Sequence, residues 1–155
     1  MGGARAWVCR RARGHSPPQT ALNPHRSQLA ASRLPRLRFD AVELADLPFA
    51  AQIPLFRAAA IFTGMHGAGY ANIIFMAPGG VVAELCPLGY CTKSYERLSS
   101  RIGLTYLRWT NTIQANAHED YNTVVAPDQF IALMQRALQA LGTTWTALAR
   151  PGGDT

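Results

Sequence analysis

Acidic residues are missing from the first 38 positions of this 155-residue chain, which carry eight arginines instead. The remaining positions hold seven lysines or arginines against nine acids, so their formal charge is −2 although the whole chain is +6. A basic surface that binds nucleic acid normally lies on the folded part of a protein or alternates with aromatic residues. Because the positive charge is confined to the first segment, we expect no nucleic-acid partner.

Long hydrophobic runs are missing as well. No apolar stretch reaches the ~18 residues that a membrane-spanning helix needs. The first residues also contain no apolar segment of the kind found in secretory signals. We therefore expect no membrane span in this chain, although a hydrophobic content of 48% is high enough for a folded core.

Cysteine is scarce, with only Cys9, Cys86 and Cys91, and three cysteines cannot all pair with one another. Cys86 and Cys91 enclose the short segment CPLGYC. This spacing fits either a small disulfide loop in an oxidising compartment or two separate thiols in a reducing one. No second pair of ligands follows at the spacing of a zinc finger, so we expect no metal site.

The first 37 residues show no hydrophobic periodicity and contain four prolines, which predicts a linker or a disordered segment. Their arginine-, serine- and alanine-rich composition is also typical of a transit peptide, and both interpretations stay open.

From residue 38 onward, short apolar segments alternate with amphipathic ones. Strands are expected at 37–44, 60–65, 81–85 and 104–110, and helices at 46–60, 69–76, 92–103 and 127–142. This alternation predicts an α/β fold, a half-Rossmann parallel sheet with helices on both faces. The chain is expected to comprise a basic segment (1–37), a folded lobe (38–146) and a tail (147–155).

The segment FTGMHGAGYANIIFMAPGGVVAEL (62–85) places His66, two glycines and Asn72 between two apolar runs. In an open parallel sheet, ligands bind where strands end, and a helix start offers free N–H groups to a phosphate. His66 is suited to donate a hydrogen bond to a phosphate, and Asn72 to contact a sugar, a phosphate or a nearby loop. Glu84, at the end of the next strand, is suited to accept hydrogen bonds from a ribose diol.

This segment contains neither G-x-G-x-x-G nor the P-loop motif G-x-x-x-x-G-K-[ST]. Glycines in a strand-to-helix turn, and a histidine that binds a loop carbonyl, also occur without any ligand. The residues alone therefore leave a phosphate site and a purely structural loop as alternatives.

Residues 49–85 resemble the C-terminal lobe of family 61 glycosyltransferases. In that family a glutamine in one helix precedes a GxHGAGxxNxxFMxPG segment and then VxEL on the next strand. The corresponding residues here are Gln52, Gly64, His66, Gly67, Ala68, Gly69, Asn72, Phe75, Met76, Pro78, Gly79 and Glu84. Residues 95–111 are similar to the helix and strand that follow in the family, and the resemblance covers about residues 38–145.

The resemblance implies a two-lobed GT-B-type enzyme of the Golgi or ER lumen. Such an enzyme transfers a sugar with inversion from a UDP-linked nucleotide-sugar donor to a glycan or protein hydroxyl, and its C-terminal lobe holds the nucleotide. The donor-binding residues would be His66, Gly67, Ala68, Gly69, Asn72 and Glu84. No D-x-D motif is present, so we expect no metal and no cofactor beyond the donor itself.

The resemblance also leaves two gaps. The family's first lobe and membrane anchor have no counterpart here, which predicts a truncated donor-binding lobe. A general base cannot be assigned, because the cluster His118, Glu119 and Asp120 lies in a polar loop that a solvated turn explains equally well. The alternative function is a non-catalytic α/β interaction domain with a relic nucleotide loop.

Overall fold

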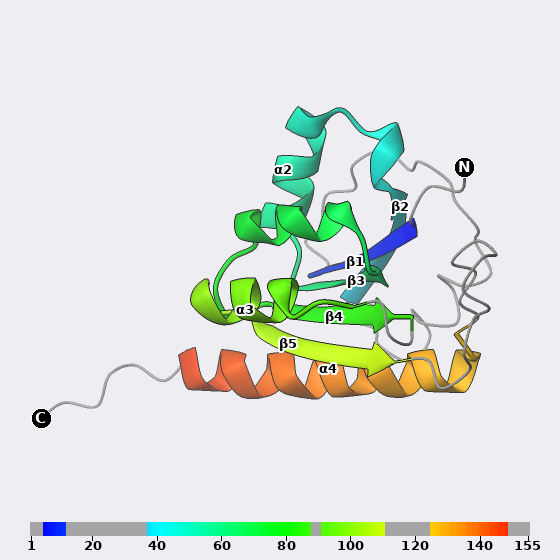
Figure 1. Ribbon diagram of the computed structural model, residues 1–155. Helices are drawn as coiled ribbons and strands as arrows, with labels where there is room; N and C mark the ends of the chain where they lie inside the picture. The colour runs from blue at the N-terminus through cyan, green and yellow to red at the C-terminus, as the bar shows by residue number, and fades with distance from the viewer. Residues whose placement is uncertain (1–4, 12–36, 88–90, 111–124, 149–155) are drawn as a thin grey trace, which may run out of the picture.

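A computed structural model describes residues 5–11, 37–87, 91–110 and 125–148 (Figure 1). Within these ranges, five strands form one sheet in the order β2-β1-β3-β4-β5. The strands are β1 (Arg5–Arg11), β2 (Leu37–Glu43), β3 (Ile61–Met65), β4 (Val81–Cys86) and β5 (Thr105–Thr110). Strands β3, β4 and β5 are parallel neighbours, which confirms the expected α/β class with a parallel sheet.

Strand β1 was not expected. It pairs antiparallel with β2 on one side and with β3 on the other, so it lies between them (Figure 1). Strand β2 therefore runs in the same direction as β3, β4 and β5 but does not pair with β3. The prediction of a linker or disordered segment was wrong for residues 5–11, because two paired neighbours stabilise a strand whose own sequence, RAWVCRR, contains three charged residues in seven.

Helices cover both faces of the sheet (Figure 1). One face carries α2 (Phe49–Arg57), the 3-10 helix η2 (Ala68–Phe75) and α3 (Ser94–Arg101), and the other carries α4 (Pro127–Leu148). A short 3-10 helix, η1 (Leu44–Asp46), joins β2 to α2. Helix α4 continues six residues past the expected end at 142, and none of the helices within the described ranges is long and apolar enough to cross a membrane.

Side chains alternate along the strands and build one core on each face. On β4, Val82 packs against the α2 and η2 layer, whereas Val81, Ala83 and Leu85 pack against α4. This is the period of two that a strand imposes on its side chains. Glu84 shares its face with Val82, so the strand aims a fully buried carboxylate at the η2 and α3 side.

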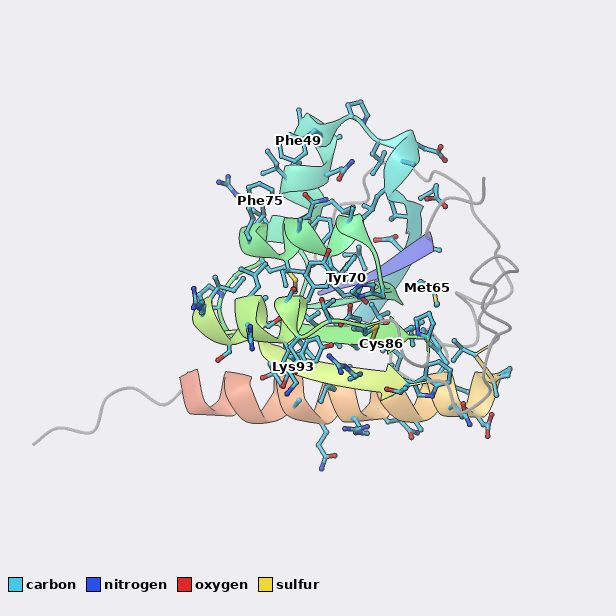
Figure 2. All side chains as sticks on the ribbon, in the orientation of Figure 1. Phe49, Met65, Tyr70, Phe75, Cys86 and Lys93 are labelled. Carbon is cyan, nitrogen blue, oxygen red and sulfur yellow. A yellow bond between two sulfur atoms is a disulfide. The ribbon has the colours of Figure 1, made fainter. Side chains whose placement is uncertain are left out.

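The core of the α2 and η2 layer contains aromatic rings that pack against one another at tilted and edge-to-face angles. The ring of Phe62 lies 4.7 Å from that of Phe56 and 4.9 Å from that of Tyr70. Phe49 and Phe75 lie on the outer side of the same layer (Figure 2), with ring centroids 6.0 Å apart and with Phe49 62% exposed. This layer therefore has aromatic pairs both in its buried core and on its outer side.

Gly79 lies in the turn before β4, and Gly103 follows the end of α3. Gly79 and Gly103 adopt φ values of 85° and 74°, which side chains other than glycine rarely accept. The N–H of Gly79 donates to the carbonyl oxygen of Gly103 at 2.8 Å. Gly103 follows the C-cap residue of α3, and this hydrogen bond joins the two turns.

Candidate functional site

The His66 segment lies at the carboxyl end of β3, beside the carboxyl end of β4. Strand β3 ends at Met65, and the backbone N–H of His66 still donates to the carbonyl oxygen of Leu85 at 2.9 Å. The chain then turns through Gly67 and enters η2 at Ala68. The first N–H groups of such a helix have no partner from a preceding turn, so the expected position of the loop at a ligand-binding edge matches the fold.

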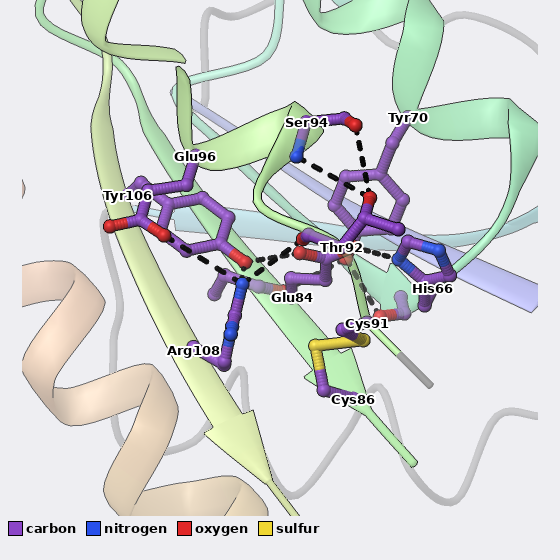
Figure 3. Close-up of a disulfide and its surroundings, with 12 residues drawn as sticks. His66, Tyr70, Glu84, Cys86, Cys91, Thr92, Ser94, Glu96, Tyr106 and Arg108 are labelled. Carbon is purple, nitrogen blue, oxygen red and sulfur yellow. Dashed lines mark hydrogen bonds and ion pairs between the residues drawn. A yellow bond between two sulfur atoms is a disulfide. The ribbon is translucent and has the colours of Figure 1, made fainter. Parts of the chain in front are cut away.

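His66 and Glu84 are hydrogen-bonded to each other. The distance between Nδ1 of His66 and Oε1 of Glu84 is 2.5 Å, and the histidine side chain is 13% exposed while the glutamate is fully buried. The other carboxylate oxygen, Oε2, accepts a hydrogen bond from the hydroxyl of Tyr106. Figure 3 shows the carboxylate between these two rings.

Glu84 is enclosed by protein groups, and its expected contact with a ribose diol stays a prediction. Both carboxylate oxygens are bound by protein groups, and none of the side chain is exposed. A buried carboxylate needs such partners, because an unpaired charge in the core is very costly. Glu84 therefore links His66 to Tyr106 through its two carboxylate oxygens.

Tyrosines surround the His66–Glu84 pair. The hydroxyl of Tyr70 lies 2.7 Å from the carbonyl oxygen of Gly64 and 3.1 Å from that of Ala83. The ring of Tyr95 lies 5.4 Å from the imidazole of His66. Burial, followed by the charge of Glu84, raises the pKa of both Tyr70 and Tyr95, and for Tyr70 the rise is large.

The third tyrosine, Tyr106, connects the pair to β5. Burial, with a further contribution from the hydrogen bond to Glu84, raises the pKa of Tyr106 to about 12, although Arg108 opposes the rise. Nε of Arg108 donates to the Tyr106 hydroxyl at 3.2 Å. All three phenols therefore stay protonated near neutral pH, and Tyr106 remains a hydrogen-bond donor to Glu84.

Tyr106 and Arg108 were not among the residues expected at the site. The signal that identifies them is their spacing, because residues two apart on a strand share a face. In the sheet, Tyr106 pairs with Val82 and Arg108 with Glu84, so both belong to the face that carries the carboxylate. Assigning faces along β5 from the sequence would have revealed them.

Asn72 and Gln52 are hydrogen-bonded to each other. Nδ2 of Asn72 donates to Oε1 of Gln52 at 2.6 Å. Nε2 of Gln52 in turn donates to the carbonyl oxygens of Leu44 and Leu47, at 2.9 and 3.0 Å. The amide nitrogen of Asn72 thus joins η2 to α2 and to the η1 turn, whereas its expected contact with a donor stays a prediction.

We expect Gln52→Ala to lower the free energy of unfolding by about 1–3 kcal/mol, because two half-buried carbonyls and the Asn72 amide lose their partner. Asn72→Ala should cost about 1 kcal/mol, and the double variant should cost less than the sum because the two side chains share a hydrogen bond. Urea denaturation measures all three, with Gln135→Ala on the exposed side of α4 as the matched control. Additive effects would contradict the coupling.

Cys86 and Cys91 are joined by a disulfide in the structure (Figure 3), with their Cα atoms 5.6 Å apart. The ligand atoms of His66, Glu84 and Cys91 also lie within 4.8 Å of one another, which by distance alone would suit a metal ion. A disulfide sulfur is not the thiolate that binds metals, however, and the other two atoms share a hydrogen bond. We therefore interpret the three side chains as neighbours in a hydrogen-bonded site.

Glycines differ in how tightly they are enclosed within the HGAG segment. A Cβ added at Gly67 would meet one described atom within 4 Å, the carbonyl oxygen of Met65 at 3.9 Å. A Cβ at Gly69 would lie 2.8 Å from the Cδ1 atom of Leu44. A side chain at position 69 would therefore require the Leu44 side chain to shift, whereas Gly67 leaves space beside the backbone.

Other residues considered from the sequence have different outcomes. Lys93, Arg97 and Arg101 are exposed to solvent. Trp109 packs against the core on the α4 side. The cluster at 118–120 lies outside the described residues.

Comparison with known proteins finds a family that this chain resembles. Residues 12–83 match the family model described as Glycosyltransferase 61, so the match begins inside the segment that we expected to lie outside the folded lobe.

Two curated relatives are each named Protein O-linked-mannose beta-1,4-N-acetylglucosaminyltransferase 2, one from Tetraodon nigroviridis and one from Takifugu rubripes. Each is 31% identical over 113 residues, which cover 70% of this chain. The chain spans 18% of the length of these relatives. Together these findings confirm that this chain resembles the glycosyltransferase 61 family, with residues 12–83 matching its model.

Proposed function

We propose that this chain holds the nucleoside diphosphate of a nucleotide-sugar donor, as part of a glycosyltransferase. The observation that carries the proposal is the position of the HGAG segment. It follows β3 at the edge of the sheet where ligands bind, begins a helix, and contains a histidine held by a buried glutamate. The family match and the names of both relatives support transfer of a sugar.

The reaction would be a displacement at the anomeric carbon of the donor sugar. An acceptor hydroxyl of a glycan or protein forms the new bond, its proton passes to a base, and the bond to the diphosphate oxygen breaks. A single displacement of this kind inverts the anomeric centre. Negative charge grows on the departing diphosphate, so N–H donors already aimed at it stabilise the transition state.

We further propose that the donor is UDP-linked, that no metal or other cofactor takes part, and that the family's two-lobed GT-B architecture applies. The compartment would be the ER or Golgi lumen. The disulfide between Cys86 and Cys91 supports this placement, because such bonds persist in oxidising compartments.

Thermal unfolding of the full chain in the presence of UDP and of a series of nucleotide sugars tests the proposal. A ligand that binds only the folded state raises its stability by about 2.7 kcal/mol at a concentration 100 times its Kd. A saturable rise in Tm with one nucleotide supports a donor site. A cooperatively folded chain that responds to none would favour the alternative, a non-catalytic α/β interaction domain with a relic nucleotide loop.

Gly67→Ala should weaken UDP binding at least about tenfold while leaving the Tm of the free chain nearly unchanged. The backbone there is extended, with φ of 168°, and an added methyl group meets little of the protein. It would instead occupy space that a diphosphate needs when it approaches the backbone. Isothermal titration measures the affinity.

Gly103→Ala is the matched control for this prediction. It places a side chain at a φ of 74°, so it should lower the Tm by a strain of about 1 kcal/mol without changing UDP affinity. If Gly67→Ala binds UDP as tightly as the unaltered chain, the diphosphate does not approach this loop.

A further inference from the structure

Four side chains meet where strands β3 and β4 end. Glu84 and Cys86 are two residues apart on β4, so they lie on the same face of the sheet. His66 follows β3, and Cys91 is bonded to Cys86. The ligand atoms of His66, Glu84 and Cys91 lie within 4.8 Å of one another, and Figure 3 shows them beside the disulfide. An imidazole, a carboxylate and two sulfurs therefore share a small volume.

This set of ligand atoms matches the chemistry of a zinc ion. Zinc in proteins is usually four-coordinate, with bonds of about 2.0–2.3 Å to imidazole nitrogen, carboxylate oxygen and thiolate sulfur. Ligand atoms around such an ion are then roughly 3–4 Å apart. Atoms already within 4.8 Å of one another reach this spacing by small shifts of their side chains. Thiolate and imidazole ligands also favour zinc over magnesium and calcium, which prefer oxygen.

The spacing of the two cysteines also fits a zinc site. Cys86 and Cys91 enclose four residues, and zinc-binding cysteine pairs typically enclose about two to four. No second ligand pair follows them at a zinc-finger spacing, but the sheet supplies one from earlier in the chain. Parallel pairing of β3 with β4 places His66 beside Glu84. Both sulfurs are used by the disulfide, so the ligand set is complete only after that bond is reduced.

We propose that reduction of the disulfide between Cys86 and Cys91 creates a zinc site formed by these two cysteines, His66 and Glu84. A dithiol supplies two electrons and two protons to the sulfur–sulfur bond and itself becomes a cyclic disulfide. The ion then replaces the proton of each thiol, and two protons pass to solvent. The inference concerns the reduced form alone, gives the ion no part in sugar transfer, and does not rest on the proposed function.

Neighbouring residues support a bound ion without rearrangement of the sheet. The hydroxyl of Tyr106 donates to Oε2 of Glu84, which leaves Oε1 to bind the ion in place of its hydrogen bond to His66. Hydrogen bonds of this kind orient the ligands of metal sites. Two thiolates and a carboxylate carry one negative charge more than the ion neutralises. Nε of Arg108 lies 3.2 Å from the Tyr106 hydroxyl, so a positive charge is close enough to offset this excess.

Cobalt titration of the reduced full chain tests the proposal, because Co²⁺ occupies zinc sites and absorbs light strongly when thiolates bind it. The chain is reduced with dithiothreitol, and the reductant is removed without air before the metal is added. We expect one Co²⁺ per chain, displaced by one Zn²⁺, whereas the oxidised chain should show no thiolate absorption. Cys9→Ser should behave like the unaltered chain, and Cys91→Ser should weaken binding of the ion at least about tenfold.

Two glutamate variants distinguish a site built by the fold from a pair of thiols that bind metal by themselves. Glu84→Gln keeps the shape of the side chain and both thiols but replaces the carboxylate with a neutral amide. It should weaken zinc binding at least about tenfold. Glu96→Gln is the matched control, because it removes a carboxylate that is 51% exposed on α3, and it should bind zinc like the unaltered chain. If the two variants bind zinc equally well, the proposal is wrong.

Thermal unfolding covers the case in which reduction destabilises the chain. An ion that binds the folded state raises its Tm, so zinc should raise the Tm of the reduced chain and leave that of the oxidised chain unchanged. A reduced chain that zinc does not stabilise, whether it is folded or unfolded without the ion, would overturn the proposal.

Discussion

Replacing Val8 with aspartate is expected to abolish cooperative folding of the chain. Val8 is fully buried in the middle of β1, where it pairs with Phe62 on one side and with Asp40 on the other. A carboxylate at this position would lose its hydration without gaining a partner, and its neighbour on β2 is also acidic. An uncompensated buried charge costs several kcal/mol, which is comparable with the ~5–15 kcal/mol by which native domains are stable.

Two control variants distinguish the effect of a buried charge at Val8 from the effects of any substitution in the sheet. Val8→Ala removes two methylene-sized groups and should cost about 1.6 kcal/mol while preserving a cooperative transition. Thr110→Asp adds the same charge at the exposed end of β5 and should have little effect. Circular dichroism during urea denaturation measures each. A cooperative transition of near-normal midpoint in Val8→Asp would mean that β1 does not belong to the core.

Phe62→Ala should lower the free energy of unfolding by about 3–5 kcal/mol, the usual cost of deleting a buried aromatic ring. The ring is 1% exposed and contacts those of Phe56 and Tyr70 on either side, so its removal leaves a cavity between packed neighbours. Because Tyr70 also binds the carbonyl oxygens of Gly64 and Ala83, loss of this packing should loosen the strand ends that carry the site. Urea denaturation and UDP titration of the same variant measure both effects.

Phe49→Ala is the matched control for the ring deletion. Phe49 is 62% exposed and meets Phe75 edge to face, so its removal should cost only about 0.5–1.5 kcal/mol. It lies on the outer side of the same layer, and UDP binding should be unaffected. Equal losses for Phe62→Ala and Phe49→Ala would contradict the assignment of the core.

The sequence predicted the parallel half of the sheet because its strands are short apolar runs between helices. Strand β4 (VVAELC) is buried throughout and tolerates only one polar side chain, Glu84, which stands out for that reason. The position of His66 at a strand end followed from the same pattern. Helix α4 was equally predictable, because its apolar residues recur on one side.

The parts that were not predicted depend on contacts between distant residues. Strand β1 is stable because β2 and β3 pair with it, and the sequence RAWVCRR does not indicate which strands those partners are. The hydrogen bond from Asn72 to Gln52 joins residues twenty positions apart, and that from Tyr106 to Glu84 joins residues 22 apart. In each case the residue type was visible in the sequence, but its partner was decided by packing.

The place of β1 in the sheet also bears on how the chain folds during synthesis. Strand β1 is synthesised before β3, and Ile61, which pairs with Cys9, lies 52 residues after it. At ~5–20 residues per second, β1 waits about 3–10 s for that strand. Three arginines in its seven residues keep the unpaired segment charged during this interval, which hinders premature association with other chains. The arginines that make β1 hard to predict as a strand therefore also keep the unpaired segment soluble until β2 and β3 are available to pair with it.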